Sequence, residues 1–577
     1  MGFVGFVILP ELIGLALLAV LDDDKAKYVA LGASLFSLAM LPFFSASGAI
    51  NWFGFGNIQF QIAMSTGALN ELLLWLVAVL APIVLFYSFG FITLPSEQKR
   101  YYAEMLIFVA SMMLVAMSAS FITLFIGWEL LSVSSYLLVG FWYFKEKAIK
   151  AARSVISTVL IGDIALFASL IIIGMSLGSF NFSALSAHAS MALRLASLLL
   201  LVALFVKSAQ FPFHEWLSDA MEGPAPVSAM LHSATMVKAG VFVAMLLFPF
   251  FLSLHVTYFM LVFGLITAFI ATFNAMRETH IKKVLAYSTI QELSLMFVAI
   301  GSNALLAAAY FFLIQSFYKA LLFFSSGAIM NATGKESLKE VSGLSSNKLA
   351  LITTIFGVLS LAGFVPFSGF FASIGISSSL SNNLLVYALI SLLSFLTSFF
   401  IFRWFAMCAK PARTERERLL YLGLPKSMLV SMSILAAFTL LASILALYLP
   451  GLLRSVPYVA YNLPHPTPLD VVITMLAISV GSLLSLFLYR KGELGNKLNA
   501  IQTTKEMKAL YAYVAYFFML LGEGVYLFDY LLSSFFDFIG LETSNLGNAA
   551  RKLATGNVLV YALLVVLALV VVVLVVR

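Results

Sequence analysis

Long apolar runs separated by short polar loops fill most of this chain. A run of about 20 apolar residues has the length of a helix that crosses a lipid bilayer. The pattern predicts sixteen such spans and therefore an all-α polytopic membrane protein. The spans are expected near residues 2–21, 27–46, 70–94, 103–121, 123–143, 153–178, 191–221, 225–250, 254–276, 282–301, 304–330, 349–376, 381–408, 427–449, 467–489 and 556–576.

Two stretches do not have the pattern of a simple span. Residues 48–68 are Gly-rich and alternate polar with apolar in NIQFQIAM, which predicts a short hairpin outside the membrane. Residues 501–555 mix aromatic and aliphatic runs with charges, which favours an amphipathic helix lying along the cytoplasmic side of the membrane. A short span at 511–527 with a re-entrant partner is the alternative for this second stretch.

Broken helices are expected in the seventh and twelfth spans, because each contains a proline within its apolar run. Pro366 lies 154 residues after Pro212, and Lys283 lies 154 residues after Glu129. The two broken spans are an odd number of spans apart, so the second unit must have the opposite topology. This spacing predicts two inverted five-helix repeats, an arrangement found in transporters. The expected division is N-terminal helices 1–100, repeats 101–250 and 251–410, helices 411–500, the lateral helix 501–555 and a last span 556–577.

Basic residues gather in the loops that follow odd-numbered spans. These loops contain DDDKAK, EQKR, KEKAIKAAR, RETHIKK, GKESLKE, KPARTERER and RKGELGNK. The positive-inside rule places them in the cytoplasm and both termini outside, in a cell membrane. The N-terminus lacks a basic region and a small-residue cleavage site, so we interpret it as a retained span.

Composition supports a membrane protein and excludes several kinds of site. The chain is 62% hydrophobic and 10% charged, whereas soluble proteins carry about 25% charged residues. The net charge of +7 lies in short loops and does not indicate a nucleic-acid partner. Cys408 is the one cysteine, so we expect no internal disulfide and no cysteine-held metal or iron–sulfur cluster. No nucleotide or metal motif is present, and we expect no cofactor or metal in this chain.

Several ionisable side chains stand inside the apolar runs: Glu129, Asp163, Lys207, His232, Lys238 and Lys319. A charge near the bilayer centre costs about 2.5–3.5 kcal/mol on insertion scales. Burial lowers the pKa of a lysine and a neighbouring carboxylate raises it again, so such a pair can load and release a proton near neutral pH. We therefore predict a proton path. Structural ion pairing is the alternative for each residue, and Asp163 could simply neutralise a lysine.

Further charges accompany this path. Glu215, Asp219 and Glu222 have the spacing of one helix face and are candidates for an entry funnel, or for a solvated helix end. Lys283, Arg403 and Glu292 are expected near span ends, where a long side chain can also reach the interface; Lys283 and Arg403 are kept as accessory candidates.

The stretches GWELLSVSSYLLVGFWY, KSAQFPFHEWLSDAMEGPAPVSAMLHSATMVKAG, HIKKVLAYSTIQELSLMF and FYKALLFFSSG resemble the antiporter-like subunits of respiratory complex I and the related Mrp-type cation/proton antiporters. The similarity covers most of residues 100–375, and the tail resembles that of L-type subunits. The resemblance implies that Glu129 and Lys207 form a Glu–Lys pair with Asp163 as acidic partner. It also implies that His232 and Lys319 lie on a central hydrophilic axis.

The same resemblance implies no redox cofactor in this chain, and partner membrane subunits contacted partly through the lateral helix. Two departures stand out: Ser373 occupies the place of an expected lysine, and Gln315 that of a histidine. Lys238 and the string FPFH look closer to the Mrp type. Three functions stay open: the proton-translocating subunit of a quinone-reducing oxidoreductase, a subunit of an Mrp-type cation/proton antiporter, or a membrane scaffold without transport.

Overall fold

The computed structural model describes most of the chain up to residue 494. The described residues are 3–55, 58–185, 190–381, 383–453, 456, 466–494 and seven positions between 530 and 542. The chain divides into two compact units, Met1–Lys508 and Ala509–Arg577, and all described residues except those seven positions belong to the first unit. Nearly all of the predicted lateral helix and the whole last span lie outside the described residues.

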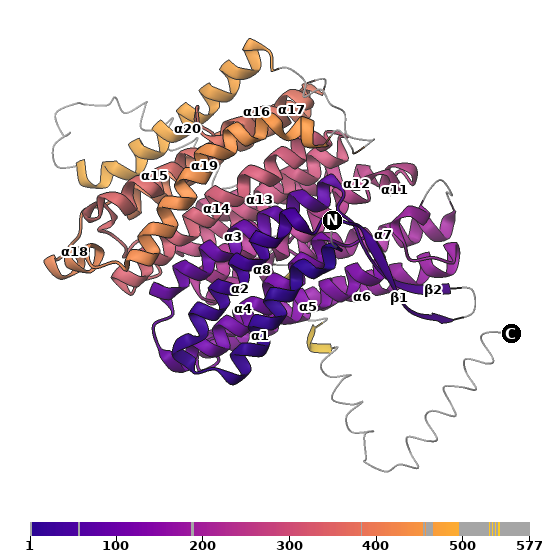
Figure 1. Ribbon diagram of the computed structural model, residues 1–577. Helices are drawn as coiled ribbons and strands as arrows, with labels where there is room; N and C mark the ends of the chain where they lie inside the picture. Colours follow the sequence, from indigo (N-terminus) through magenta and orange to yellow (C-terminus); the bar gives the residue numbers. More distant parts are fainter. Residues whose placement is uncertain are drawn as a thin grey trace. The chain divides into compact units, whose positions relative to one another are not determined.

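Helices make up most of the described residues of the first unit and run roughly side by side (Figure 1). Their bounds are α1 Leu9–Val20, α2 Ala26–Met40, α3 Ala68–Phe91, α4 Pro95–Ala116, α5 Phe121–Val139, α6 Glu146–Leu177, α7 Met191–Lys207, α8 Glu215–Asp219, α9 Ala225–Ser233, α10 Met236–Leu246, α11 Phe248–Ser253, α12 Thr257–Arg277, α13 Ile281–Gly301, α14 Leu305–Thr333, α15 Lys348–Ala362, α16 Ser368–Ser379, α17 Leu384–Cys408, α18 Glu415–Leu422, α19 Lys426–Leu452 and α20 Pro468–Leu494.

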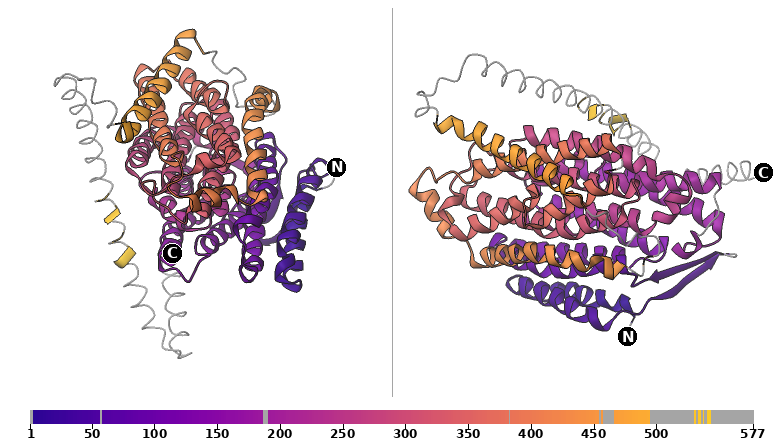
Figure 2. Two further views of the ribbon diagram at one scale, coloured as in Figure 1. Left: turned by 90° about the vertical axis from the view of Figure 1, so that its left-hand side faces the viewer. Right: turned by 90° about the horizontal axis from the view of Figure 1, so that it is seen from above.

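The helical membrane fold expected from the apolar runs is confirmed. Within the described residues, 11 helical segments are long and apolar enough to cross a membrane, and Val4–Val20 and Lys348–Ala362 are shorter apolar helices. Sixteen spans remain a prediction. The centre of the unit is formed by α14, α9–α10 and α13. In the most apolar stretch of each, 100%, 94% and 89% of the residues are buried. The helices α1 and α2 form an outer layer, as the end-on view shows (Figure 2).

The predicted hairpin is present. Strands β1 (Gly48–Phe55) and β2 (Ile58–Met64) pair antiparallel. Ser120 and Thr123, at the start of α5, donate hydrogen bonds to backbone oxygens of β2 at 2.9 and 2.8 Å, which hold the hairpin on the helices. The hairpin and the charged helix α18 lie at opposite ends of the unit (Figure 1).

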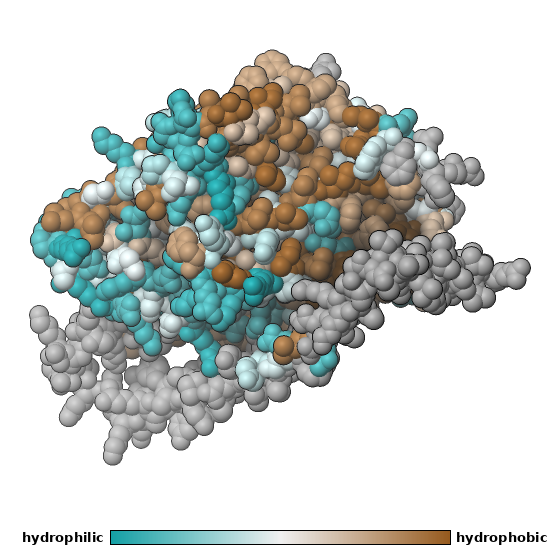
Figure 3. Space-filling model, turned by 90° about the horizontal axis from the view of Figure 1, so that it is seen from below, coloured by the Kyte–Doolittle hydropathy of each residue, from teal (hydrophilic) through white to brown (hydrophobic). Residues whose placement is uncertain are grey.

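The outer surface is largely apolar along the helices and polar toward one end. Hydrophobic residues cover much of the face in Figure 3, and hydrophilic residues gather toward its left end, the end at which α18 lies in Figure 1. Outward side chains on α6 such as Ile164 and Phe167 are exposed. A surface of this kind suits contact with lipid acyl chains along the helices and with water at the ends.

Both predicted helix breaks are present. The helix α7 ends at Lys207 and α8 follows the cis Phe211–Pro212 bond, while α15 ends at Ala362 and α16 follows the cis Val365–Pro366 bond. Three residues before each proline, Ala209 and Gly363 have positive φ values of 51° and 84°. These two residues are also 154 apart in the sequence. The inverted orientation of the repeats and the domain boundaries remain predictions.

A third break is not evident from the sequence. The apolar run of the eighth span predicts one helix, but α9 ends at Ser233 and α10 begins at Met236. Thr235 leaves the helical region with φ −122° and ψ −121°. Its hydroxyl donates to the Met230 carbonyl at 2.8 Å, an oxygen that also accepts from the Ala234 backbone N–H at 3.3 Å. A threonine without a neighbouring proline or glycine gives no signal of this break.

Gly369 allows α16 to pack directly on the end of α15. A Cβ at this position would lie 1.6 Å from the Ser360 carbonyl oxygen. We expect Gly369→Ala to destabilise the protein by about 1–3 kcal/mol, because the two helix ends must move apart. The apparent melting temperature in detergent would measure this loss.

Gly375→Ala is the matched control, because this glycine lies on the same helix and a Cβ there would meet no atom within 4 Å. It should melt like the unaltered protein or slightly higher. Equal melting temperatures for the two variants would contradict the close packing of α15 and α16.

Candidate functional site

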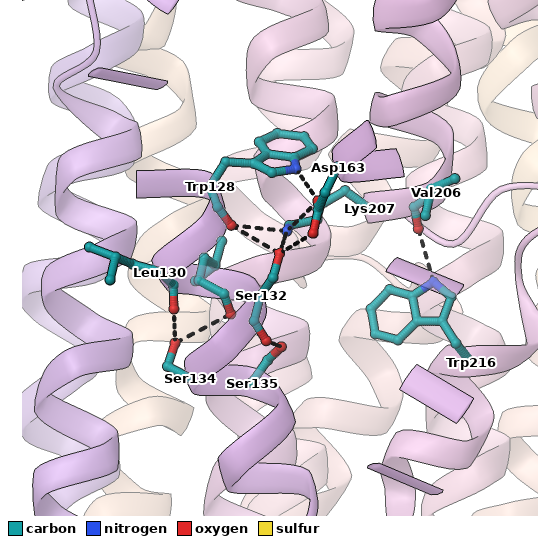
Figure 4. A network of polar contacts seen from close by, with 10 residues as sticks. Trp128, Leu130, Ser132, Ser134, Ser135, Asp163, Val206, Lys207 and Trp216 are labelled. Carbon is teal, nitrogen blue, oxygen red and sulfur yellow. Dashed lines mark hydrogen bonds and ion pairs between the residues drawn. The ribbon is translucent and has the colours of Figure 1, made fainter. Parts of the chain in front are cut away.

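The first buried ion pair joins α7 to α6. Lys207 is fully buried at the C-terminal end of α7, where the helix dipole favours a cation. Its ammonium lies 3.5 Å from an Asp163 carboxylate oxygen and donates to the Ser132 hydroxyl at 2.5 Å and the Trp128 carbonyl at 3.2 Å (Figure 4). Asp163 accepts from the Trp128 indole N–H and the Ser132 hydroxyl, both at 2.8 Å. Both charges are therefore hydrogen-bonded, as buried charges must be.

Glu129 does not make the direct ion pair expected from the resemblance. It is half-buried on α5, and among the described residues the carboxylate paired with Lys207 belongs to Asp163. Trp128 and Ser132 are one helical turn apart on the face of α5 that meets Lys207, whereas Glu129 is rotated about 100° from Trp128. It is still close enough to interact electrostatically with Asp163 and Lys207.

Lys238 and His232 lie on either side of the break between α9 and α10. Both are fully buried. The Lys238 ammonium donates to the Phe312 carbonyl and the Ser316 hydroxyl of α14, each at 2.5 Å. The His232 ring packs on Phe323 with centroids 4.5 Å apart, and its two nitrogens have no hydrogen-bond partner among the described residues.

The second buried ion pair joins α14 to α13. The Lys319 ammonium lies 2.7 Å from a Glu292 carboxylate oxygen and donates to the Ser288 hydroxyl at 2.7 Å. Glu292 also accepts from the Tyr318 hydroxyl at 3.0 Å and the Gln315 amide at 3.2 Å. Lys319 and Glu292 are 0% and 3% exposed in their side chains, so this pair is as deeply buried as the first.

The expectation that Glu292 lies near a span end is wrong. It lies in the middle of α13, ten residues after the first residue of the span that the sequence predicts. The sequence does indicate this position, because Glu292 is far from both ends of that apolar run. Its partner could not be read from sequence, because α13 and α14 meet only after folding.

One helix carries the contacts that link these groups. From α14, Phe312 and Ser316 bind Lys238, and Gln315 donates to Glu292 and, at 3.4 Å, to the His232 carbonyl. Lys319 follows one turn later. Two lysines, a histidine and one carboxylate from α9, α10, α13 and α14 thus meet along one face of α14 in the buried centre of the unit.

The three candidate funnel carboxylates do not share one α-helix. The helix α8 ends at Asp219, and the chain continues as a 3-10 turn, Ala220–Glu222. Glu215 is exposed, and Asp219 accepts from the Ser154 hydroxyl of α6 at 2.7 Å. The expected single acidic face is therefore wrong, because the turn tightens after Asp219.

Of the two accessory basic residues, Lys283 lies near the start of α13 as expected, whereas Arg403 is buried. Lys283 is partly exposed, and its neighbour Lys282 is the buried one, with its ammonium donating to the Gly223 carbonyl at 2.6 Å. Arg403 is buried and donates to the Met276 and Glu278 carbonyls at the end of α12. Such a contact stabilises a helix C-terminus.

Metal and disulfide chemistry have no site in the part of the chain that the structure describes. Among those residues, no group of three or more His, Cys, Asp or Glu side chains could hold a metal ion. Cys408 is buried with a free thiol. The chemistry that the described groups can supply is acid–base chemistry in a dry environment.

Substitutions of Asp163 and Lys207 should have strongly coupled effects on the free energy of unfolding. We expect Asp163→Asn to lower the free energy of unfolding by about 3–5 kcal/mol, because it leaves a buried ammonium without a countercharge. Asp163→Asn combined with Lys207→Met should cost clearly less than the sum of the single changes. Thermal inactivation in detergent measures both effects.

Glu146→Gln is the control, because Glu146 pairs with Lys150 at 2.8 Å on the exposed surface. Its cost should stay below about 1 kcal/mol. Additive losses in the double variant, or a loss for Asp163→Asn no larger than that of Glu146→Gln, would contradict the buried pair.

Comparison with known proteins gives the family. A family model described as "NADH:quinone oxidoreductase/Mrp antiporter, TM" matches residues 118–400, a range that includes both buried ion pairs, Lys238 and His232. NADH-quinone oxidoreductase subunit L of Buchnera aphidicola is 32% identical over 431 residues, covering 70% of each chain. The subunit L of Campylobacter jejuni is 34% identical, covering 65% of this chain and 64% of that one. The chloroplast NAD(P)H-quinone oxidoreductase subunit 5 of Marchantia polymorpha is 32% identical, covering 61% of this chain and 54% of that one.

Solved structures share the fold. The Mrp complex from Dietzia sp. DQ12-45-1b matches with a TM-score of 0.77 at 20% identity, covering 99% of this chain and 63% of that one. An archaeal respiratory complex, the membrane-bound sulfane sulfur reductase, matches with a TM-score of 0.69 at 18% identity, covering 82% and 98%. The helix breaks, the buried charges and these similarities lead to one conclusion. The chain belongs to the family of antiporter-like transmembrane subunits of NADH:quinone oxidoreductases and Mrp antiporters.

Proposed function

We propose that this chain is the proton-translocating membrane subunit of a complex I-like quinone oxidoreductase. It moves H⁺ along buried lysine, histidine and carboxylate side chains, and electron transfer in other subunits drives the movement. The observation that carries the proposal is that three lysines, Lys207, Lys238 and Lys319, are fully buried in the bundle. Lys207 pairs with a carboxylate of α6, Lys238 binds α14, and Lys319 on α14 pairs with a carboxylate of α13.

Stability alone does not account for these charges. Replacing a buried ion pair by well-packed apolar residues is often neutral or stabilising by about 1–4 kcal/mol. A helix bundle that needed only a rigid core would be served as well by leucine at these positions. Groups that change protonation state, by contrast, must be ionisable and must be shielded from bulk water.

The contacts suggest how a proton enters the path. Half-buried Glu129 is the group best placed to take up a proton from the surface and pass it toward Lys207 and Asp163. The Ser132 hydroxyl accepts from Lys207 and donates to Asp163, so it can relay a proton between them in one concerted step. The ammonium then becomes a neutral amine and the carboxylate a carboxylic acid.

From the first pair the path continues toward α14. Lys238, bound to Ser316, and His232, next to the Gln315 amide, lie between Lys207 and Lys319 in this scheme. Ordered water would bridge the distances that side chains do not span. Lys319 receives the proton, and its ion pair with a carboxylate allows it to bind one while buried.

Partners and orientation follow from the same proposal. Other membrane subunits would lie beside this chain and contact residues 501–555, and the redox centres and quinone site would belong to them. The basic loops would face the cytoplasm and both termini the outside.

A second function is a subunit of an Mrp-type cation/proton antiporter. The match to an Mrp complex over 99% of this chain favours it at the level of fold. Such a subunit would work without electron transfer and would exchange protons for another cation. Iron–sulfur spectra of the purified native assembly would separate the two functions.

Lys207→Ala in the assembled complex tests proton translocation. Reconstituted vesicles with a pH-sensitive dye should show at least a tenfold lower rate of proton movement, because the first buried proton carrier is gone. Lys147→Ala is the control, since Lys147 is exposed, and it should leave the rate unchanged. Full-rate transport by the Lys207→Ala complex, with assembly intact, would leave a scaffold as the function.

A further inference from the structure

We propose that Glu292 receives the proton from Lys319 and releases it to water in a small cavity beside α16, the second half of the broken twelfth span. The outer half of the path is then complete without a lysine at position 373. This inference rests on the proposed proton-translocating function and assigns its last buried carrier.

Hydrogen-bond donors hold the Glu292 carboxylate in place on more than one side. One carboxylate oxygen lies 2.7 Å from the Lys319 ammonium and accepts from the Gln315 amide, and the other accepts from the Tyr318 hydroxyl at 3.0 Å. These donors fix the carboxylate against the ammonium. Ser288, one helical turn before Glu292, holds the ammonium from the same helix at 2.7 Å.

The same carboxylate borders a cavity that Lys319 does not line. The cavity offers about 20 Å³ to the centre of a water molecule, which is room for one water. It lies among α13, α14, α15, α16 and α17, and its polar lining residues are Gln291, Glu292, Tyr318, Ser373, Ser394 and Thr397.

The lining is suited to water rather than to an apolar molecule. The Gln291 amide donates to the Thr397 hydroxyl at 2.7 Å, while its carbonyl oxygen is buried with no hydrogen-bond partner among the described residues. A water in the cavity can donate to that oxygen and face Glu292. Ser373 also lines the cavity, from α16, the second half of the broken span.

The surroundings of the Asp163–Lys207 pair differ from those of the Lys319–Glu292 pair. Asp163 accepts from Trp128 and Ser132 in addition to facing Lys207, and it does not line this cavity. Its carboxylate therefore serves to keep the proton on the path. At the second pair the carboxylate stands between the lysine and the water, which makes Glu292 the point of release.

The transfer balances in protons and charge. The Lys319 ammonium gives H⁺ to the Glu292 carboxylate, which leaves a neutral amine beside a carboxylic acid and avoids an isolated buried charge. The carboxylic acid then gives H⁺ to the cavity water, and the resulting hydronium passes the proton on along the Ser373 hydroxyl. A proton from the Lys238 side restores the ammonium.

Neighbouring groups do not offer another acceptor at this point. A serine hydroxyl at 373 can pass a proton along but cannot hold one as a carboxylate does. Arg403 donates to the carbonyls at the end of α12 and does not line the cavity.

Glu292→Gln in the assembled complex is the direct test. Proton movement in reconstituted vesicles should fall at least tenfold, because the glutamine amide keeps the shape but binds no proton. Glu292→Gln combined with Gln315→Glu should restore most of the rate. Position 315 is one turn before Lys319 on α14, so its carboxylate can pair with the same ammonium. Glu146→Gln, an exposed carboxylate, should have no effect.

The variants separate this inference from the function on which it rests. A full rate for Glu292→Gln alongside a loss for Lys207→Ala overturns the role of Glu292 and leaves proton translocation standing. A loss that Gln315→Glu does not restore also overturns it, because the carboxylate would then matter only for packing at its own position. A full rate for Lys207→Ala would mean that the proposed function itself fails.

Discussion

A lysine ammonium can stay in the interior of a helix bundle only if protein groups replace the water that it loses. This requirement governs the centre of the structure. Lys207 and Lys319 each obtain a carboxylate and a serine hydroxyl, and Lys238 obtains a carbonyl and a serine hydroxyl. The three lysines use groups from different helices, so the helices that supply those groups must pack closely and in a fixed register.

The interrupted helices lie beside two of the buried lysines. The backbone carbonyls that bind Lys207 and Lys238 belong to the continuous helices α5 and α14, while the breaks lie next to the two lysines themselves. Lys207 stands at the end of α7, directly before its break, and Lys238 at the start of α10, directly after another. These two charges thus lie where the bundle is least regular, whereas Lys319 and Glu292 lie within the unbroken helices α14 and α13.

Local patterns were enough to predict the helical membrane fold, the hairpin and the two proline breaks, because each depends on neighbours in sequence. The partners of the charges were not predictable in the same way. Lys207 pairs with Asp163 because α5, α6 and α7 meet with Trp128 inward, which rotates Glu129 away. The break at Thr235 likewise depends on packing, since its sequence contains no helix breaker.

The central claim is that buried carboxylates gain and lose protons while the protein works. Infrared difference spectra of the assembled complex during turnover test it most directly, since a protonated carboxyl group has its own C=O stretching band. The account predicts a band that appears with proton movement and is absent when Glu292 is replaced by glutamine. Undiminished proton movement without any change in carboxyl protonation would contradict it.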